Sequence, residues 1–363
     1  MKLNDDPSGT TPGHVLLFFK PYEVDRFVPG DRYLKRLVRP LYNLTHHRQK
    51  VTGFGVSFEL LCRGLAAAGH VVHRNPYALA NANPDYPVGL VGGPALLEGW
   101  SLPNPALLGP SLYDQPGLAP RLFDDPRFKS YVCLGDWMHD LFETGYRGRC
   151  VKWFAGIDAQ AWPDLSGEAK DLDFILYDKV HWDRDHYERA FIAPLREALA
   201  ARGLSFETIR YGHYDHGTFR ALLRRAKGLL FLSENETQGI AYQEAMASGL
   251  PVLAWDRGYW ADPQWREHFA TPPRASSTPF FSEACGERFT GLDDFGAALD
   301  RFLARRQAYR PRDYVVDNLS LAQSGRLYAD AYFALAGEGA GAPEAGKTSL
   351  AAKATKITQR MSL

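Results

Sequence analysis

The sequence of 363 residues lacks the long apolar run that a membrane-spanning helix requires. Its longest weakly polar stretch, VGLVGGPALL at 88–97, is half of the ~20 residues that a bilayer span needs. The opening MKLNDDPSGTTPG carries no apolar segment after its single lysine, so no secretory signal is expected. With 45% hydrophobic and 13% aromatic residues, the chain can form a core, which excludes disorder of the whole chain.

The sequence has no surplus of either charge and few cysteines. Its 42 basic and 42 acidic residues give a net charge of zero, which argues against a general nucleic-acid binder, because such proteins carry a basic excess. The cysteines stand far apart without a C-x-x-C pair: Cys62, Cys133, Cys150 and Cys285. This spacing argues against a disulfide framework or a zinc ribbon and favours free thiols in a reducing cytoplasm. The histidines show no H-E-x-x-H or similar metal-ligand spacing.

Strand and helix patterns alternate along the first 160 residues. HVLLFFK at 14–20 predicts a buried strand, and TGFGVS at 52–57 predicts a glycine-containing turn that opens a helix ending near Gly69. A strand at 70–75 completes the start of a Rossmann-like unit. A helix is expected around 136–145. Further strands are predicted at 87–93, 105–110, 129–135 and 150–156.

The polar stretch 158–171 predicts a linker, after which a second α/β series begins. Its strands are predicted at 173–178, 205–212, 229–233 and 250–256, and its helices at 186–203, 217–228, 239–249 and 292–306. A helix at 314–337 is expected to pack back on the body, and 338–363 is expected to be a disordered tail. The predicted fold is therefore two doubly wound Rossmann-like domains, at 1–160 and 170–313, that face each other across a cleft. Such an arrangement suits a two-substrate enzyme, because open α/β sheets bind ligands at the carboxyl ends of their strands.

The most informative stretch is LLFLSENETQGIAYQEAMASGLPVLAW at 229–255. Glu236 falls in the loop after a predicted strand, and Glu244 falls about one and a half turns into the next helix. Gly239 would let a ligand phosphate approach the backbone, where the N–H groups of Ile240 and Ala241 would face it. Glu244 could then accept hydrogen bonds from the two hydroxyls of a ribose, and Glu236 from sugar hydroxyls. The alternative is an ordinary βαβ unit with two solvated glutamates.

The whole string in this stretch resembles the E-x7-E signature of glycosyltransferase family 4 (glycosyl transferases group 1) and its glycogen-synthase-like relatives. The matching residues are Ser233, Glu236, Gly239, Glu244, Ala245, Met246, Ala247, Gly249 and Pro251. One departure is that Thr237 and Gln238 replace the family's usual Gly-Phe. The resemblance implies the GT-B fold and transfer from a nucleotide-diphospho-sugar with retention of anomeric configuration.

Two further motifs extend the resemblance in the second half. The family places an arginine and a lysine five residues apart after the first strand of this domain, and Lys179 and Arg184 have this spacing with the two types exchanged. Two cations at a helix start can neutralise a leaving diphosphate, whereas a solvated helix start is the alternative. The family's base-binding backbone follows a glycine that corresponds to Gly212, so His213 and Tyr214 would meet the nucleotide base. Packing is the alternative for Tyr214.

The first half agrees more loosely. TGFGVSFELLCRGLAAAGHVV resembles the family's glycine loop, in which Gly53 and Gly55 would let the backbone pass close to the donor phosphates. Many relatives carry a histidine in the loop after the fourth strand, but LLGPSLYDQPG has none. The residues left as replacements are Asp114, Tyr113 and a histidine from 46–47.

The insertion at 21–50 is longer than in relatives, and its part 32–50 contains six basic residues and no acid among leucines. This pattern favours an interfacial amphipathic helix or an acceptor-binding lid, with a helix packed on the domain as the alternative.

The sequence therefore predicts a cytoplasmic glycosyltransferase of the hexosyltransferase kind, in which Glu236, Lys179 and Arg184 are the catalytic candidates. Its expected partners are a UDP-, GDP- or other nucleotide-diphospho-sugar donor and a glycan, lipid-linked or small-molecule acceptor, as in polysaccharide biosynthesis. No nucleic acid, no other cofactor and no metal are expected, while 32–50 offers peripheral contact with the inner face of the membrane. The alternatives are an inverting transferase or a nucleotide-sugar epimerase on the same fold, or a non-catalytic protein that binds a nucleotide-sugar or a glycan.

Overall fold

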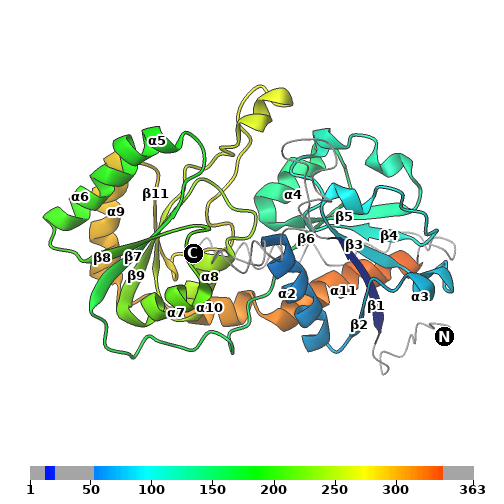
Figure 1. The fold of residues 1–363 in the computed structure, drawn as a ribbon, viewed down its shortest axis with the longest axis horizontal. Helices are drawn as coiled ribbons and strands as arrows, with labels where there is room; N and C mark the ends of the chain where they lie inside the picture. Colours follow the sequence, from blue (N-terminus) through cyan, green and yellow to red (C-terminus); the bar gives the residue numbers. More distant parts are fainter. Residues whose placement is uncertain (1–12, 21–52, 338–363) are drawn as a thin grey trace, which may run out of the picture.

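The computed structural model describes residues 13–20 and 53–337 of the chain. It contains two β-sheets of parallel strands, each flanked by helices. The two sheets lie side by side along the longest axis of the molecule (Figure 1). The predicted fold class of two Rossmann-like α/β domains is confirmed. The predictions for the basic segment 32–50, for His46 and His47 and for the tail 338–363 lie outside the described residues. Among the described residues, every helix is too short or too polar to cross a lipid bilayer.

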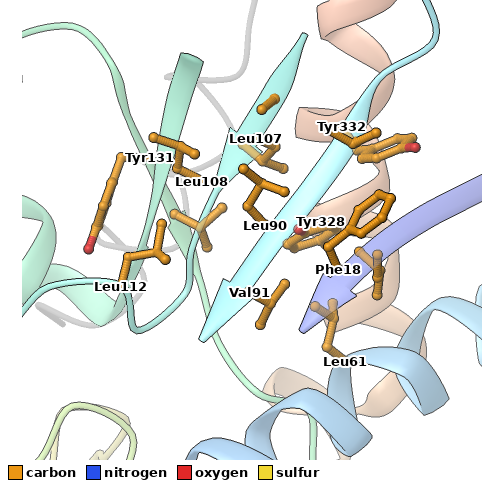
Figure 2. Close-up of a cluster of buried hydrophobic side chains, with 14 of the residues drawn as sticks. Phe18, Leu61, Leu90, Val91, Leu107, Leu108, Leu112, Tyr131, Tyr328 and Tyr332 are labelled. Carbon is orange, nitrogen blue, oxygen red and sulfur yellow. The ribbon is translucent and has the colours of Figure 1, made fainter. Parts of the chain in front are cut away.

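The first sheet has six parallel strands in the order β2-β1-β3-β4-β5-β6. These are β1 (His14–Lys20), β2 (Val71–Arg74), β3 (Val88–Gly92), β4 (Ala106–Leu108), β5 (Phe128–Leu134) and β6 (Cys150–Trp153). The helices and 3-10 turns of this half are α2 (Gly53–Ala67), α3 (Tyr77–Asn81), α4 (Gly135–Glu143), η1 (Pro94–Leu96), η2 (Pro116–Leu118) and η3 (Leu122–Asp124). Figure 2 shows part of this core, where Phe18 and Leu90 from the sheet cluster with Leu61 of α2 and with Tyr328 and Tyr332 of the C-terminal helix.

The second sheet has five parallel strands in the order β11-β10-β9-β7-β8. These are β7 (Leu172–Lys179), β8 (Phe206–Arg210), β9 (Ala226–Ser233), β10 (Val252–Trp255) and β11 (Gly286–Phe289). Its helical segments are α5 (Arg184–Tyr187), the π-helical η4 (Glu188–Ile192), α6 (Ala193–Ala201), α7 (His216–Arg225), α8 (Ile240–Ala247), η5 (Pro263–Glu267) and α9 (Leu292–Arg305). Its core strands are fully buried, which explains their near-continuous apolar sequences.

The structure corrects four sequence expectations. Gly53 and Gly55 belong to the first turn of α2 and not to a turn that precedes the helix. Residues 226–228 extend β9 rather than the preceding helix, since Ala226 pairs with Leu172 of β7. The short edge strand β11 was not predicted. The last predicted helix is divided into α10 (Pro311–Asn318) and α11 (Leu321–Gly337).

Helix α11 returns to the first domain, so that described residues near both ends of the chain belong to one body (Figure 1). The Tyr332 hydroxyl accepts a hydrogen bond from the backbone N–H of Leu16 at 2.9 Å, and Trp153 Nε1 donates to the Ser324 carbonyl at 3.0 Å. Helices α2 and α11 cross at Gly64 and Gly325, where a Cβ on Gly325 would collide with the Gly64 carbonyl. This crossing therefore requires glycine for close backbone approach.

We expect Gly325→Ala to lower the stability by about 1–3 kcal/mol, because the added methyl group forces the two helix backbones apart. Helix propensity alone would favour alanine by up to about 1 kcal/mol. The matched control is Gly296→Ala on α9, where a Cβ would meet only the end of the Arg202 side chain, at 3.4 Å. Thermal and denaturant unfolding should show a loss for Gly325→Ala and no loss for Gly296→Ala. Equal stabilities of the two variants would contradict the crossing described here.

Candidate active site

The carboxyl ends of β7 and β9 bring the first two predicted catalytic residues together. The register of the two strands places Lys179 opposite Ser233, and Glu236 follows three residues later in the loop. Lys179 Nζ lies 2.7 Å from Oε1 and 2.8 Å from Oε2 of Glu236. Ser233 Oγ donates to the same carboxylate at 2.8 Å, and the Glu236 side chain is almost completely buried. The Lys179 ammonium also lies over the ring of Tyr211, 4.6 Å from its centroid.

Arg184 belongs to a neighbouring but separate network. Its guanidinium donates to the buried Asp178 carboxylate at 2.7 Å and to Glu188 at 2.5 Å. Asp178 precedes Lys179 in β7, and successive side chains of a strand point to opposite faces. The two predicted diphosphate ligands thus have different carboxylate partners in this structure, and a shared clamp stays a prediction.

Gly239 has a backbone role that the sequence did not reveal. Its φ of +75° is left-handed, and a Cβ there would collide with the Tyr242 ring. It forms the N-terminal cap position of α8, whose first turn contains Ile240 and Ala241. N–H groups in the first turn of a helix have no intrahelical acceptor, so they are suited to an anion. Contact of these groups with a donor phosphate stays a prediction.

Glu244 lies on α8, half-buried, and its carboxyl has no hydrogen-bond partner among the described residues. Burial raises its pKa to about 8, and the positive charge of Arg220 offsets only part of this shift. An acid in this state favours a ligand that supplies hydroxyl groups. This is compatible with the predicted ribose contact, which stays a prediction.

The predicted base-binding residues differ in their surroundings. Gly212 has a φ of +78° and open space around it, and His213 is exposed. The Tyr214 hydroxyl lies 2.8 Å from the Tyr177 hydroxyl, and the two rings meet edge to face. Burial raises the pKa of Tyr214 to about 12. Tyr214 thus packs on the domain core, and its contact with a base stays a prediction.

Gln238, one of the two departures from the family signature, connects the two halves of the chain. Its Oε1 accepts from the Ala155 N–H at 2.8 Å, and its Nε2 donates to the Ala155 carbonyl at 3.2 Å. Its Nε2 also donates to Gln243 Oε1 at 2.7 Å, while Gln243 Nε2 donates to the Gln238 carbonyl at 2.7 Å. Trp137 Nε1 of α4 donates to the Glu236 carbonyl at 2.8 Å. The loop that carries Glu236 is therefore held from the first domain.

A cavity of about 220 Å³ lies between the two domains beside this loop. The first domain contributes Asp114, Trp137 and Met138, and the second contributes His181, Trp182, Ser233, Glu234, Asn235, Thr237, Trp260 and Asp262. Trp260 reaches it on the connection from β10 to β11, shown in yellow in Figure 1, and packs against Leu141 of α4.

Three residues were considered in place of the family's histidine. Of the described ones, Asp114 lines this cavity. Desolvation in the cleft raises the pKa of its carboxyl, and the nearby Asp262 carboxylate adds to the rise. Tyr113 does not line the cavity, and its backbone N–H donates to the Tyr131 hydroxyl at 2.9 Å.

Sequence reasoning missed Glu234, which directly follows β9. Its buried carboxylate accepts from the backbone N–H groups of His181 and Trp182 at 3.0 and 3.1 Å, and burial raises its pKa. Desolvation and the Lys179 charge lower the pKa of His181 in the same loop. The position of Glu234 at a strand end was the available signal.

The sequence contains two Asp-x-Asp strings, at 171–173 and 183–185, and the first lies at the opposite end of β7 from this site. Asp173 at the start of β7 pairs with Lys227 at 2.8 Å, and Asp171 pairs with Arg225 at 3.0 Å. Asp183 precedes α5 in a left-handed conformation. Within residues 13–20 and 53–337, no group of three or more His, Cys, Asp or Glu side chains is placed to hold a metal ion.

No family model and no curated protein matches the sequence. Similar folds occur among solved structures. AviGT4, a glycosyltransferase involved in avilamycin A biosynthesis, is 15% identical with a TM-score of 0.48, over 89% of this chain and 98% of that one. The lipopolysaccharide outer core galactosyltransferase WaaB is 9% identical with a TM-score of 0.48, over 88% and 99% of the two chains. TarM is 10% identical with a TM-score of 0.46, over 68% of this chain and about half of its own, 54%. At these values the similarity carries no argument about activity, substrate or partner.

The raised pKa of Glu244 predicts a pH-dependent penalty on stability. Its folded pKa of about 8 lies above the ordinary value of 4.5, so the folded protein keeps a proton that the unfolded chain loses. Stability should therefore fall as pH rises from about 5 to 8. We expect Glu244→Gln to remove this penalty. Its free energy of unfolding relative to the wild type should therefore rise by about 1–3 kcal/mol between pH 5 and pH 8. The measurement is unfolding of both proteins at pH 5 and at pH 8. Glu197→Gln, at an exposed position on α6, is the control. A difference between Glu244→Gln and wild type that does not change with pH would contradict the assignment.

Proposed function

We propose that this chain is a glycosyltransferase that transfers a sugar from a nucleotide-diphospho-sugar to a hydroxyl acceptor with retention of configuration. The observation that carries the proposal is the Lys179–Glu236 pair, buried at the carboxyl ends of β7 and β9 beside an interdomain cavity. Carboxyl ends of parallel strands are where open α/β sheets bind ligands. A cation for a phosphate and a carboxylate for hydroxyl groups are the two partners that such a donor needs.

The pair suggests how the donor would be held. The Lys179 ammonium is neutralised by Glu236. An arriving diphosphate would take over the ammonium, and the Glu236 carboxylate would then accept hydrogen bonds from the donor sugar. The N–H groups of Ile240 and Ala241 would complete the phosphate site, and Glu244 would accept the ribose hydroxyls. His213, exposed after Gly212, would meet the base.

In the proposed reaction, the acceptor oxygen bonds to the anomeric carbon on the face from which the diphosphate departs. The bond from that carbon to the diphosphate oxygen breaks, and this oxygen takes the acceptor proton. Negative charge grows on the diphosphate during the step, so the Lys179 ammonium contributes more in the transition state than in the ground state. Arg184 could join it only after leaving Asp178 or Glu188.

The cavity size supports a sugar rather than the whole donor at this point. Sites for complete ligands of drug size measure about 300–1,000 Å³, and this cavity measures about 220 Å³. Trp182 and Trp260 offer apolar ring faces, while Asp114 and Asp262 offer acceptors for sugar hydroxyls. We propose that Asp114 takes the place of the family's histidine and faces the donor sugar. The acceptor class, a cytoplasmic location and membrane contact through 32–50 remain part of the proposal.

A screen of UDP-, GDP-, ADP- and dTDP-sugars by thermal shift and donor hydrolysis tests the proposal. We expect one nucleotide class to raise the melting temperature and its sugar to be hydrolysed slowly without acceptor. Lys179→Ala should lower turnover about 10²–10³-fold, the usual effect of removing one preorganised charge partner. Lys129→Ala, near the amino end of β5 and outside the site, is the matched control. Nucleotide binding without turnover of any donor would favour a non-catalytic binding protein.

Turnover should also survive chelation, because Lys179 and the α8 N–H groups can neutralise the diphosphate without a divalent ion. The measurement is donor hydrolysis with the matched donor before and after EDTA treatment. Loss of activity with EDTA and its recovery with Mg²⁺ or Mn²⁺ would overturn the metal-independent mechanism and redirect attention to Asp183 and Asp185.

A further inference from the structure

A second and larger cavity, of about 560 Å³, lies at the amino ends of β9 and β10, whereas the candidate active site lies at the carboxyl ends. It is bordered by Lys227 near the start of β9 and by Leu250 and Pro251 just before β10. Ser233, at the cleft end of β9, is six residues beyond Lys227, which corresponds to about 20 Å along the strand. The cavity is therefore separate from the candidate active site.

Basic side chains predominate around this back cavity. Five of its lining residues are cationic, namely Lys170, Lys227, Arg306, Arg310 and Arg312, and three are acidic, namely Asp164, Glu168 and Asp313. Glu168 forms an ion pair at 3.0 Å with Arg224, and Arg224 does not line the cavity. The lining therefore carries a surplus of positive charge, although the whole chain has none.

The cations are only partly neutralised by their partners. Lys170 Nζ donates to the Leu223 carbonyl at 2.9 Å, and Arg310 donates to the carbonyls of Gln307 and Tyr309 at 2.8 Å. Carbonyl oxygens satisfy hydrogen bonds but carry no net charge to balance a cation. Desolvation by burial lowers the pKa of Lys170, and the nearby Glu168 and Asp164 carboxylates offset only part of this shift.

Arg306 is the most available of these cations. It lies 3.9 Å from Asp173 and makes no shorter ion pair among the described residues. Arg312 differs, because its guanidinium donates to the carbonyls of Trp162 at 2.7 Å and of Ala247 at the end of α8. Arg312 thus has a structural role, whereas Arg306 and Arg310 can turn toward a ligand.

We propose that the back cavity binds a small molecule that carries phosphate groups. Guanidinium groups bind phosphate oxygens through paired hydrogen bonds, and two of them surround this space together with Lys170. Lys227 also lines it but is paired with Asp173 at 2.8 Å. A volume of about 560 Å³ lies within the range of small-molecule sites. A concave site of this size fits a compact phosphorylated metabolite better than a membrane surface or a nucleic acid.

Pyrophosphate is the probe, titrated into the full chain by calorimetry at constant ionic strength, with melting temperature as a second measurement. We expect pyrophosphate to bind the wild type, and Arg306→Gln with Arg310→Gln to weaken this binding about 10-fold or more, as for lost hydrogen bonds between charged groups. Arg121→Gln, the same charge change at an exposed site of the first domain, should bind as the wild type does. Arg306→Lys should retain most of the affinity, because it keeps the charge.

Lys179→Gln separates the two sites. Pyrophosphate binding that survives in Lys179→Gln, and is lost when Arg306→Gln and Arg310→Gln are added to that variant, supports the proposal, whatever the outcome for glycosyl transfer. The single variant Arg306→Gln, which removes only a 3.9 Å contact, should fold normally and already show weaker binding. The proposal is overturned if the wild type does not bind pyrophosphate, if both arginine variants bind it unchanged, or if Lys179→Gln alone abolishes binding.

Discussion

The parallel pairing of β7 with β9 is the constraint on which the candidate site depends. Its register sets Lys179 beside Ser233, so that the loop after β9 can bring the Glu236 carboxylate back onto the ammonium. Both charges are largely withdrawn from water, and a buried charge is tolerated only when it is paired and hydrogen-bonded. Removal of either partner leaves the other uncompensated, so the pair contributes to the order of this corner of the sheet.

The position of this corner relative to the first domain depends on a few polar contacts. Gln238 holds the backbone of Ala155, Trp137 holds the Glu236 carbonyl, and α11 carries the chain back across the first sheet. The loop that carries Glu236, the segment after β6 and α11 are thus attached to one another. Gln238 stands where the resembled family has another residue, and its amide contacts fix the loop that carries Glu236.

Much of the fold follows from local pattern, and much of the site does not. The buried strands and the position of Glu236 at a strand end were predictable, because apolar runs and strand ends depend on residues that are consecutive in the sequence. The partner of Arg184 was not, since Asp178 and Glu236 are both within reach of a cation near β7 and only packing decides between them. The Gln238–Ala155 contact joins residues 83 positions apart, and the cavity wall of Asp114 and Asp262 depends on how two domains meet. Gly53 and Gly55 were misassigned because glycine favours a turn locally, whereas packing on α11 extends the helix.

The account rests on Lys179 being shared between Glu236 and a donor diphosphate, and a double-mutant cycle tests this most directly. The nucleoside diphosphate that the protein binds would be titrated into the wild type, Glu236→Gln, Lys179→Ala and the double variant. The account predicts that Glu236→Gln binds it as tightly as the wild type or more tightly, since the ammonium is released. Lys179→Ala and the double variant should bind about 10-fold or more weakly and alike. Independent and equal losses in the two single variants, adding in the double variant, would contradict the account.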